Sequence, residues 1–466
     1  MHLTDTTQTI TALATPPGIG AIAVIRISGK ESISIADMIF KSRNKTKRLS
    51  SSKSHTIHFG EIHDNNIMLD EVLVSIFKSP HSYTGEDSVE ISCHGSVFIQ
   101  QQILQLIIRK GARLAQPGEF TLRAFLNGKL DLSQAEAVAD LISSDSSASH
   151  QLAMQQMRGG FSSEIKMLRQ ELIHFASLLE LELDFAEEDV EFANRDQLKS
   201  LISNLISHIS NLVSSFELGN VIKHGVPVVI AGKPNVGKST LLNALLNEER
   251  AIVSEIAGTT RDTIEEEITL GGIKFRFIDT AGLRETTDAI EKIGVSRTWE
   301  KIQQSPVLIY MFDVDESGPG DVKAELDQLK ENISDESFII LPVMNKIDHH
   351  THDKLKLKFG DITGVHFISA KAKINIDKLI AALLSKVNTT GLSKRDVIVT
   401  NARHVEELSK TLESLKQAYE GLETKRTTDL ISSDIKYALH HLGEITGEIT
   451  TDDLLENIFS KFCIGK

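Results

Sequence analysis

The sequence of 466 residues contains little cysteine, no long apolar run and no basic N-terminus. Its two cysteines, Cys93 and Cys463, are too few for a disulfide framework and lack the paired spacing of a zinc site. The longest apolar stretches fall well short of the roughly 18 residues that span a bilayer. Residues 1–10 contain no Lys or Arg, which excludes the basic region of a secretory signal. These absences predict a cytoplasmic protein that does not associate with a membrane.

An excess of positive charge is also missing. The formal net charge of −14 argues against a broad basic footprint on nucleic acid, so any RNA contact has to be local. One basic run stands among Ser, Asn and Thr residues and consists of Lys41, Arg43, Lys45, Lys47, Arg48 and Lys53. A solvated loop is the first interpretation of this run, and an RNA contact is the second.

Proline is scarce, and its positions outline the domains. Two long tracts, 118–226 and 343–466, contain no proline inside them, and in the first apolar residues recur at helical spacing. The helical pattern returns after about residue 396. Between Val226 and about Val387, strands and helices alternate, which is typical of a doubly wound parallel sheet. The first 115 or so residues combine strand-like segments with an apolar helix over Val97–Arg109.

The length is too great for one ordinary core, and three domains fit it. The expected fold class is multidomain: an N-terminal α+β domain, a central all-α helical domain and an inserted α/β domain. We expect the N-terminal domain at 1–118 and the two halves of the helical domain at 119–220 and 389–466. The α/β domain is expected at 221–388.

The α/β segment contains a phosphate-binding loop. Gly232–Ser239, GKPNVGKS, matches G-x-x-x-x-G-K-[ST] and stands between the strand-like VPVVIA and the helix-like TLLNALL. Glycines allow the backbone N–H groups to surround phosphates at a helix N-terminus. Lys238 is expected to reach the β and γ phosphates, and the Ser239 hydroxyl to bind Mg²⁺.

Four companion motifs follow in the expected order. Asp279–Gly282, DTAG, ends a strand and suits a carboxylate near Mg²⁺. In NKID, Asp348 can accept hydrogen bonds from guanine N1 and N2, which selects GTP over ATP. GTTRD supplies a switch segment with Thr260 as a second Mg²⁺ ligand, and SAK supplies a base-contacting loop. A chance match of all five is implausible, so the sequence predicts a GTP-hydrolysing P-loop domain. The expected GTP-binding residues are Asn235, Val236, Gly237, Lys238, Ser239, Thr240, Ser254, Glu255, Ile256, Ala257, Gly258, Thr259, Thr260, Asp279, Thr280, Ala281, Gly282, Asn345, Lys346, Asp348, Ser369, Ala370 and Lys371.

One residue departs from the common GTPase pattern. Many GTPases place after DTAG a Gln that orients the attacking water, whereas Leu283 stands there in this chain. An apolar side chain cannot orient water, so another group has to do so. Glu285, Asp288 and Glu291 follow in the next segment, and Arg284 reads as a surface residue rather than an arginine finger.

Motifs along nearly the whole chain resemble the tRNA modification GTPases of the MnmE (TrmE) family. They are ATPPGIGAIAVIRISG near the start, SYTGEDSVEISCHG at 82–95, PGEFTLRAFLNGKLDLSQAEAVADLI at 117–142 and the terminal FCIGK. The resemblance implies a homodimer that forms a heterotetramer with a flavin-binding partner, MnmG (GidA), which carries FAD. Such a complex modifies C5 of the wobble uridine of certain tRNAs with an aminomethyl or carboxymethylaminomethyl group, while GTP hydrolysis drives a conformational change.

The resemblance assigns a one-carbon donor site to the N-terminal domain. A 5-formyl or 5,10-methylene tetrahydrofolate would contact Arg26, Glu90, Lys129 and the terminal Lys466. Arg and Lys suit the glutamyl carboxylate of folate, and Glu suits the donor edge of the pterin. Taken without the family, Arg26 and Lys129 read as surface charges.

The resemblance also accounts for the missing glutamine, because members of the family are activated by K⁺ when their G domains pair. Asn235, with oxygens of Ser254, Ile256 and Thr259, would bind K⁺, which offsets negative charge in the transition state. Glu291 matches the family's water-positioning glutamate, although by sequence alone it reads as a solvated helix residue.

Three questions stay open at this stage. The thiol of Cys463 either takes part in chemistry at the folate site or is a small packed residue, and Cys93 reads as a core residue. A ribosome-assembly GTPase is a rival function, but it predicts an appended basic RNA module. The other rival is a scaffold that senses nucleotide without useful turnover, for which Leu283 would be the expected mark.

Overall fold

The computed structural model describes residues 7–43, 48–184, 194–246, 252–253, 265–279, 305–332, 338–387 and 397–465. These residues form two compact units: the first contains 1–142, 155–207 and 407–466, and the second contains 143–154 and 208–406. Within the described ranges, none of the helices combines the length and the apolar character needed to cross a membrane.

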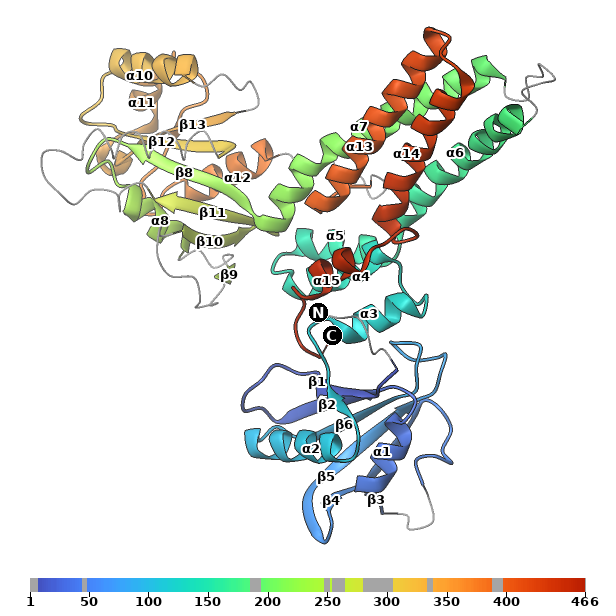
Figure 1. The fold of residues 1–466 in the computed structure, drawn as a ribbon. Coiled ribbons are helices and arrows are strands. Elements are labelled where there is room, and N and C mark those ends of the chain that lie inside the picture. Colours follow the sequence, from blue (N-terminus) through green and yellow to red (C-terminus); the bar gives the residue numbers. More distant parts are fainter. Residues whose placement is uncertain are drawn as a thin grey trace, which may run out of the picture. The chain divides into compact units, whose positions relative to one another are not determined.

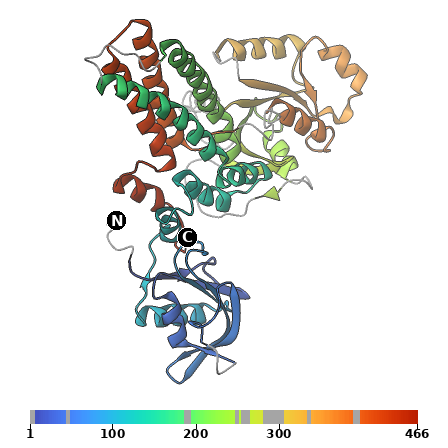
Figure 2. The same cartoon turned by 90° about the vertical axis from the view of Figure 1, so that its right-hand side faces the viewer.

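The N-terminal sheet has seven strands in the order β3-β4-β5-β6-β2-β1-β7 (Figures 1 and 2). Its strands are β1 (Ile10–Leu13), β2 (Ile22–Ser28), β3 (Phe40–Ser42), β4 (Thr56–Asp64), β5 (Ile67–Phe77), β6 (Ser88–His94) and β7 (Arg113–Leu114). Alternate residues of β2 and β5 are buried, and they pack against α1 (Ser32–Ile39) and α2 (Val97–Arg109) in one core. The expected apolar helix is confirmed as α2. Lys41 of the basic run belongs to β3, so the run is not wholly a loop.

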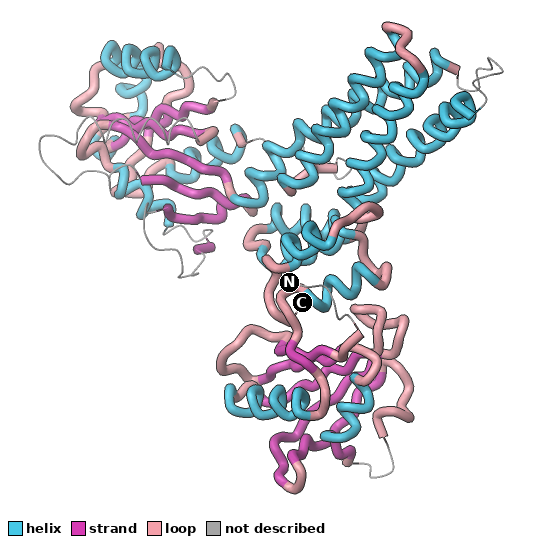
Figure 3. Tube along the Cα trace, viewed as in Figure 1, coloured by secondary structure: helices cyan, strands magenta, loops and turns pink. Residues whose placement is uncertain are grey.

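Helices form the two tracts on either side of the α/β segment (Figure 3). They are α3 (Glu119–Leu126), α4 (Leu132–Ser143), α5 (Ser147–Met157), α6 (Gly160–Asp184), α7 (Arg195–His224), α13 (Ala402–Glu423), α14 (Thr428–Thr446) and α15 (Asp452–Phe459). Most of α5 and the C-terminal part of α7 belong to the second unit. The proline-free tracts are thus helical as expected. Lys436 of α14 pairs with Glu180 of α6 at 2.7 Å, and Lys199 of α7 pairs with Glu423 of α13. Helices from before and after the α/β segment therefore contact one another.

The second sheet also has seven strands, in the order β14-β13-β12-β8-β11-β10-β9. They are β8 (Val226–Gly232), β9 (Ile252–Val253), β10 (Glu265–Leu270), β11 (Ile273–Asp279), β12 (Val307–Asp313), β13 (Ile339–Asn345) and β14 (His366–Phe367). Strands β8 and β11–β14 are parallel. Strands β8, β12 and β13 are almost continuously apolar, as strands covered on both faces require, whereas β11 alternates apolar residues with Lys274 and Arg276.

Helices cover both faces of this sheet (Figure 1). On one face pack α8 (Lys238–Leu246) and α12 (Ile376–Lys386), and on the other pack α10 (Pro319–Asn332) and α11 (His352–Phe359). The short 3₁₀ helix η3 (Ile347–His349) follows β13. The alternation of strands and helices in the sequence correctly predicted a doubly wound sheet.

The start of α5 and the residues just before it contact the β10–β11 hairpin of the same unit. The carbonyl oxygen of Gly272 accepts hydrogen bonds from Ala148 N at 3.2 Å and from Ser147 Oγ at 3.3 Å. Lys274 Nζ lies 2.7 Å from Asp145 Oδ2. Residues 143–154 are thus part of the α/β unit although they precede it by about 70 residues in the sequence.

The C-terminal segment returns to the N-terminal sheet. Cys463 O accepts a hydrogen bond from Gly118 N at 3.3 Å, and Gly465 is buried beside Leu13 at the end of β1. Gly465 has a φ of +96°, and a Cβ there would collide with the Leu13 carbonyl oxygen. The positive φ and the lack of space therefore both require glycine at this position.

Candidate nucleotide-binding site

The GTPase motifs meet at the carboxyl edge of the second sheet. The phosphate loop follows β8, Asp279 is the last residue of the neighbouring β11, and Asn345 is the last residue of β13. Asp279 is paired in register with Ile230 of β8. In open parallel sheets this edge is where ligands bind.

The phosphate loop has the backbone geometry that its sequence requires. Asn235 has a left-handed φ of +61°, and Gly237 has a φ of +99°. A side chain at Gly237 would collide with Asn345 Nδ2, so glycine is needed at this position. Lys238 is buried and donates from Nζ to Gly232 O at 3.0 Å and to Lys233 O at 2.9 Å. Its ammonium group is therefore held within the loop at the N-terminus of α8.

Asn345 connects two of the motifs. Its Nδ2 donates to Val236 O in the phosphate loop at 2.7 Å, and its Oδ1 accepts from Ala370 N at 3.0 Å. The asparagine is only 3% exposed. These two hydrogen bonds bring the phosphate loop, the NKID motif and the SAK loop together.

Asp348 is held by the SAK loop. Ser369 Oγ donates to Asp348 Oδ1 at 2.5 Å and accepts from Ala372 N at 3.0 Å. This hydroxyl lowers the pKa of Asp348, which keeps the carboxylate ionised and able to accept hydrogen bonds. Asp348, Lys371 and Asn235 are exposed, whereas Ser369 and Ala370 are buried.

Asp313 is a further residue of this site, and none of the sequence motifs indicated it. It ends β12 at the same edge, is 3% exposed, and lies 2.6 Å from Lys346 Nζ of the NKID motif. Lys346 adopts a left-handed φ of +67°, which places its backbone in a tight turn after β13. The segment VLIYMFDV could have indicated Asp313, because it is an apolar strand that ends near a carboxylate.

Several predicted site residues lie outside the described residues. They are Ser254, Glu255, Ile256, Ala257, Gly258, Thr259, Thr260, Thr280, Ala281, Gly282, Leu283, Glu291 and Lys466. The predicted roles of these residues in Mg²⁺ binding, K⁺ binding and water positioning stay predictions.

In the N-terminal domain, two of the predicted folate contacts form an ion pair. Arg26 of β2 and Glu90 of β6 are register partners, with Nη2 and Oε1 2.8 Å apart. The guanidinium also lies over the rings of Tyr83 and Phe120, at 5.4 and 5.6 Å from their centroids. Both charged side chains are partly exposed, so a ligand can reach them.

Lys129 and the C-terminal segment border the same region. Lys129 is exposed and lies beside Gly85 in the loop that contains Tyr83. Gly465 packs against the end of β1, whose Ala12 is the register partner of Arg26. Arg26 and Glu90 are thus paired, and Lys129 lies beside the loop whose Tyr83 ring contacts Arg26.

The two cysteines have different surroundings. Cys93 is buried in the core as expected, and burial raises the pKa of its thiol to about 11. His94 points away from that core and contacts Asp70 at 2.7 Å, so the adjacent pair is not a catalytic dyad. Cys463 is exposed. Its thiol is thus accessible to solvent.

A phosphate loop joined through a buried asparagine to the loop that holds the Asp348 carboxylate, at the carboxyl edge of a parallel sheet, is typical of P-loop GTPases. Comparison with known families shows which group of P-loop GTPases the chain matches. Residues 9–129 match the family described as GTP-binding protein TrmE N-terminus, and residues 132–463 match the MnmE helical domain.

Curated relatives match along nearly the whole chain. The protein of Flavobacterium johnsoniae is 58% identical over 465 residues, covering 98% of this chain and 99% of its own. That of Cytophaga hutchinsonii is 57% identical over 464 residues, covering 100% and 99%, and that of Bacteroides fragilis is 50% identical over 468 residues, covering 98% and 99%. Each is named tRNA modification GTPase MnmE. The chain belongs to the MnmE family, and it is a GTP hydrolase.

Proposed function

We propose that this GTPase works with a flavin-binding partner, MnmG, to modify C5 of the wobble uridine of certain tRNAs. The one-carbon unit comes from a tetrahydrofolate derivative, and GTP hydrolysis drives a rearrangement of the domains. The family supports this proposal, and the observation that carries it is the joining of three GTPase motifs through Asn345.

The division of labour along the chain belongs to the same proposal. Residues 1–118 form the dimerisation and folate-binding domain, 119–220 and 389–466 form the helical domain, and 221–388 form the inserted GTPase domain. The protein acts in the cytoplasm as a homodimer, and the dimer joins MnmG, which holds FAD, in a heterotetramer. Ion pairs between α6 and α14 support one helical domain made from two separate segments.

Mg²⁺ would be held by Ser239 and Thr260 and would neutralise charge on the phosphates. The exposed hydroxyl of Ser239 at the start of α8 fits an oxygen-preferring cation. Lys238 binds the β and γ phosphates, and Asp348 accepts from guanine. Ser254–Thr260 and Asp279–Gly282 complete the pocket as switch segments.

K⁺ would be held by Asn235 with oxygens of Ser254, Ile256 and Thr259, and it would offset negative charge that develops in hydrolysis. Asn235 fits this role because its side chain is exposed on the phosphate loop and its backbone adopts a left-handed turn. Glu291 positions the attacking water in place of the glutamine replaced by Leu283.

The tetrahydrofolate derivative would supply the one-carbon unit, bound by Arg26, Glu90, Lys129 and Lys466. The cross-strand Arg26–Glu90 pair fits this group because its partly exposed charges offer one donor fork and one carboxylate. Cys463 lies on the segment that returns to β1, which supports a role for its thiol beside this site.

The test is steady-state GTP hydrolysis in matched K⁺ and Na⁺ buffers. Wild type, Glu291→Ala and Asn235→Ala are compared with the control Glu331→Ala on the exposed surface of α10. We expect a large K⁺-specific rate increase in wild type and in the control, lost in both site variants. Equal slow rates of wild type in both salts would instead favour a switch that senses nucleotide without useful turnover.

A further inference from the structure

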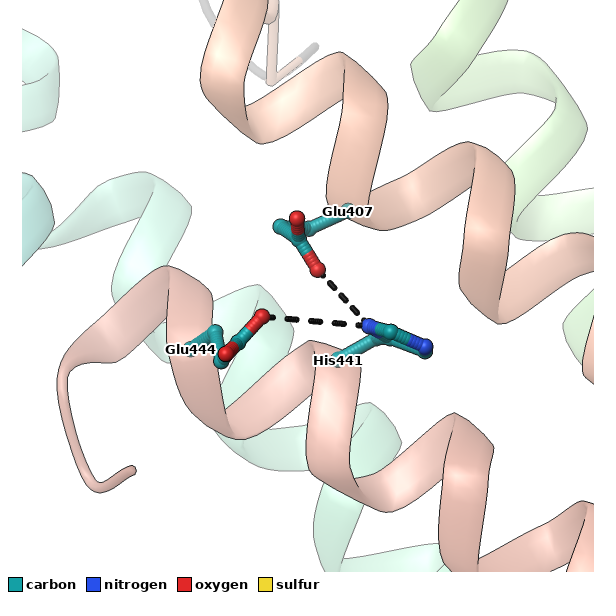
Figure 4. A group of neighbouring side chains, drawn as sticks. All are labelled: Glu407, His441 and Glu444. Carbon is teal, nitrogen blue, oxygen red and sulfur yellow. Dashed lines mark hydrogen bonds and ion pairs between the residues drawn. The ribbon is translucent and has the colours of Figure 1, made fainter. Parts of the chain in front are cut away.

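Two helices of the helical domain bring a histidine and two carboxylates together. His441 and Glu444 lie three residues apart on α14 and so share one face of that helix. Glu407 of α13 faces them, and Figure 4 shows the three side chains pointing toward one another. The ligand atoms that the three residues can offer all lie within 4.8 Å of one another.

The distances match a small coordination sphere. His441 Nδ1 lies 2.8 Å from Glu407 Oε2 and 3.8 Å from Glu444 Oε2. Zinc bonds to nitrogen and oxygen of about 2.0–2.2 Å in a tetrahedron imply ligand-to-ligand distances of about 3.3–3.5 Å. One observed distance is shorter than that range and the other is longer. Shifts of the ligand atoms by up to about 0.5 Å would bring both distances into the range.

The cluster places two carboxylates around one imidazole. Glu407 Oε2 and Glu444 Oε2 both face His441 Nδ1, and Lys410 is a positively charged side chain that pairs with Glu407. A divalent cation bound between the three side chains would offset the charge of both carboxylates.

Lys410 and His440 contact the outer carboxylate oxygens of the cluster, Oε1 of Glu407 and Oε1 of Glu444. Lys410 Nζ binds Glu407 Oε1 at 2.8 Å, so Oε2 is the oxygen that faces His441. The side chain of Glu407 is 9% exposed, and those of His441 and Glu444 are 21% and 24% exposed. The site is thus buried on the α13 side and open on the α14 side, where water could complete the coordination.

We propose that Glu407, His441 and Glu444 form a binding site for a first-row divalent metal ion, best matched by Zn²⁺, which fastens α13 to α14. The mixture of one imidazole and two carboxylates favours zinc or cobalt over Mg²⁺ and Ca²⁺, which prefer oxygen ligands alone. This site is separate from the nucleotide site and does not depend on the proposed function.

The test uses the nucleotide-free full-length protein after treatment with a chelator. Zn²⁺ affinity is measured by competition with a chromophoric chelator, and Co²⁺ serves as a spectroscopic probe. We expect a stoichiometry of about one, a visible Co²⁺ band and a Zn²⁺-dependent rise in Tm. His441→Ala and Glu444→Gln should each weaken Zn²⁺ binding at least about tenfold and remove the band. The matched control His174→Ala, on the exposed surface of α6, should bind as wild type does.

A second variant separates metal binding from structural damage. Lys410→Met keeps all three ligands but removes a positive charge beside Glu407, so it should bind Zn²⁺ more tightly than wild type. The proposal is overturned if wild type shows no saturable binding, or if His441→Ala and Glu444→Gln bind Zn²⁺ unchanged. Unchanged or weaker binding by Lys410→Met would likewise contradict it.

Discussion

Asn345 donates a hydrogen bond of 2.7 Å to the carbonyl oxygen of Val236, more than 100 residues away in the sequence. The same side chain accepts from Ala370 N, so one buried amide determines how the phosphate loop and the base-contacting loop are spaced. The two loops are thus held together by this side chain, and on the proposed function recognition of the phosphates and of the base would be coupled through it.

Asn345→Ala should weaken the binding of GDP and GTP alike. The substitution leaves Val236 O and Ala370 N without this partner, and an unsatisfied buried group costs about 1–3 kcal/mol. We expect nucleotide affinity to fall at least about tenfold, since about 1.4 kcal/mol corresponds to a factor of ten. Titration with a fluorescent guanine nucleotide measures the change. Asn211→Ala, on the exposed surface of α7, is the control, and equal affinities of the two variants would refute the coupling.

Ser369→Ala should shift the acid limit of GTP binding to higher pH. The Ser369 hydroxyl lowers the pKa of Asp348, so in wild type the ionised acceptor persists as the pH falls toward that lowered value. Without the hydroxyl, Asp348 becomes protonated at a higher pH. GTP affinity measured over a pH series should show the shift, while Ser385→Ala on α12 should not. A uniform loss of affinity at every pH would indicate only a loosened loop.

Glu119→Gln should destabilise the N-terminal domain at neutral pH. Burial alone would raise the pKa of Glu119, but hydrogen bonds from Arg113, the Gln116 N–H and Arg123 lower it overall. The side chains of Glu119 and Arg123 are only 4% and 1% exposed. Breaking a buried pair costs about 3–5 kcal/mol, because it leaves an uncompensated charge. Urea denaturation at neutral pH measures this loss.

The sign of the pH effect follows from the lowered pKa of Glu119. Its contribution to stability is fully present above the unfolded-state pKa and is lost as the pH falls through the folded-state pKa. The difference between wild type and Glu119→Gln should therefore shrink in acid. Glu71→Gln, which removes only an exposed and distant partner of Arg43, should unfold as wild type does at each pH. A difference between wild type and Glu119→Gln that stays constant down to strongly acidic pH would contradict this account.

Arg26→Ala should reduce binding of 5-formyltetrahydrofolate to the N-terminal domain. The guanidinium bonds Glu90 and lies over two aromatic rings, so its removal takes away a charged donor and releases its partner. We expect at least a tenfold loss of affinity by calorimetry, since hydrogen bonds to charged groups contribute about 1.5–3 kcal/mol. Arg43→Ala is the matched control, because Arg43 also stacks on an aromatic ring but lies on the β3 side of the sheet. Comparable binding by wild type and both variants would remove Arg26 from the folate site.

The sequence predicted that the phosphate loop, Asn345 and the SAK loop lie at one edge of the sheet because these motifs are local. Each consists of a few adjacent residues at the end of an apolar strand, and parallel strands bring those ends to one edge. The double hydrogen bond of Asn345 was not predictable, because it depends on the three-dimensional spacing of β8, β13 and the loop after β14. Asp313 was missed because a single carboxylate after a strand is not a motif.

Contacts between distant segments were the least predictable. Arg26 and Glu90 were singled out only through the family, since their pairing requires β2 and β6 to be neighbours in a fixed register. The Glu407–His441 contact likewise depends on how α13 lies against α14. Periodicity predicts that both segments are helices, but it does not specify which faces meet.

The contacts of residues 143–154 with the β10–β11 hairpin determine which residues a separately expressed GTPase domain has to include. A fragment that begins at residue 221 would have no Ser147, Ala148 or Asp145 to bind Gly272 and Lys274. Its hairpin turn would then lack these two hydrogen bonds and this ion pair. The GTPase unit of the intact chain is therefore discontinuous, and rates measured on a contiguous fragment would describe an enzyme whose β10–β11 turn has lost its native partners.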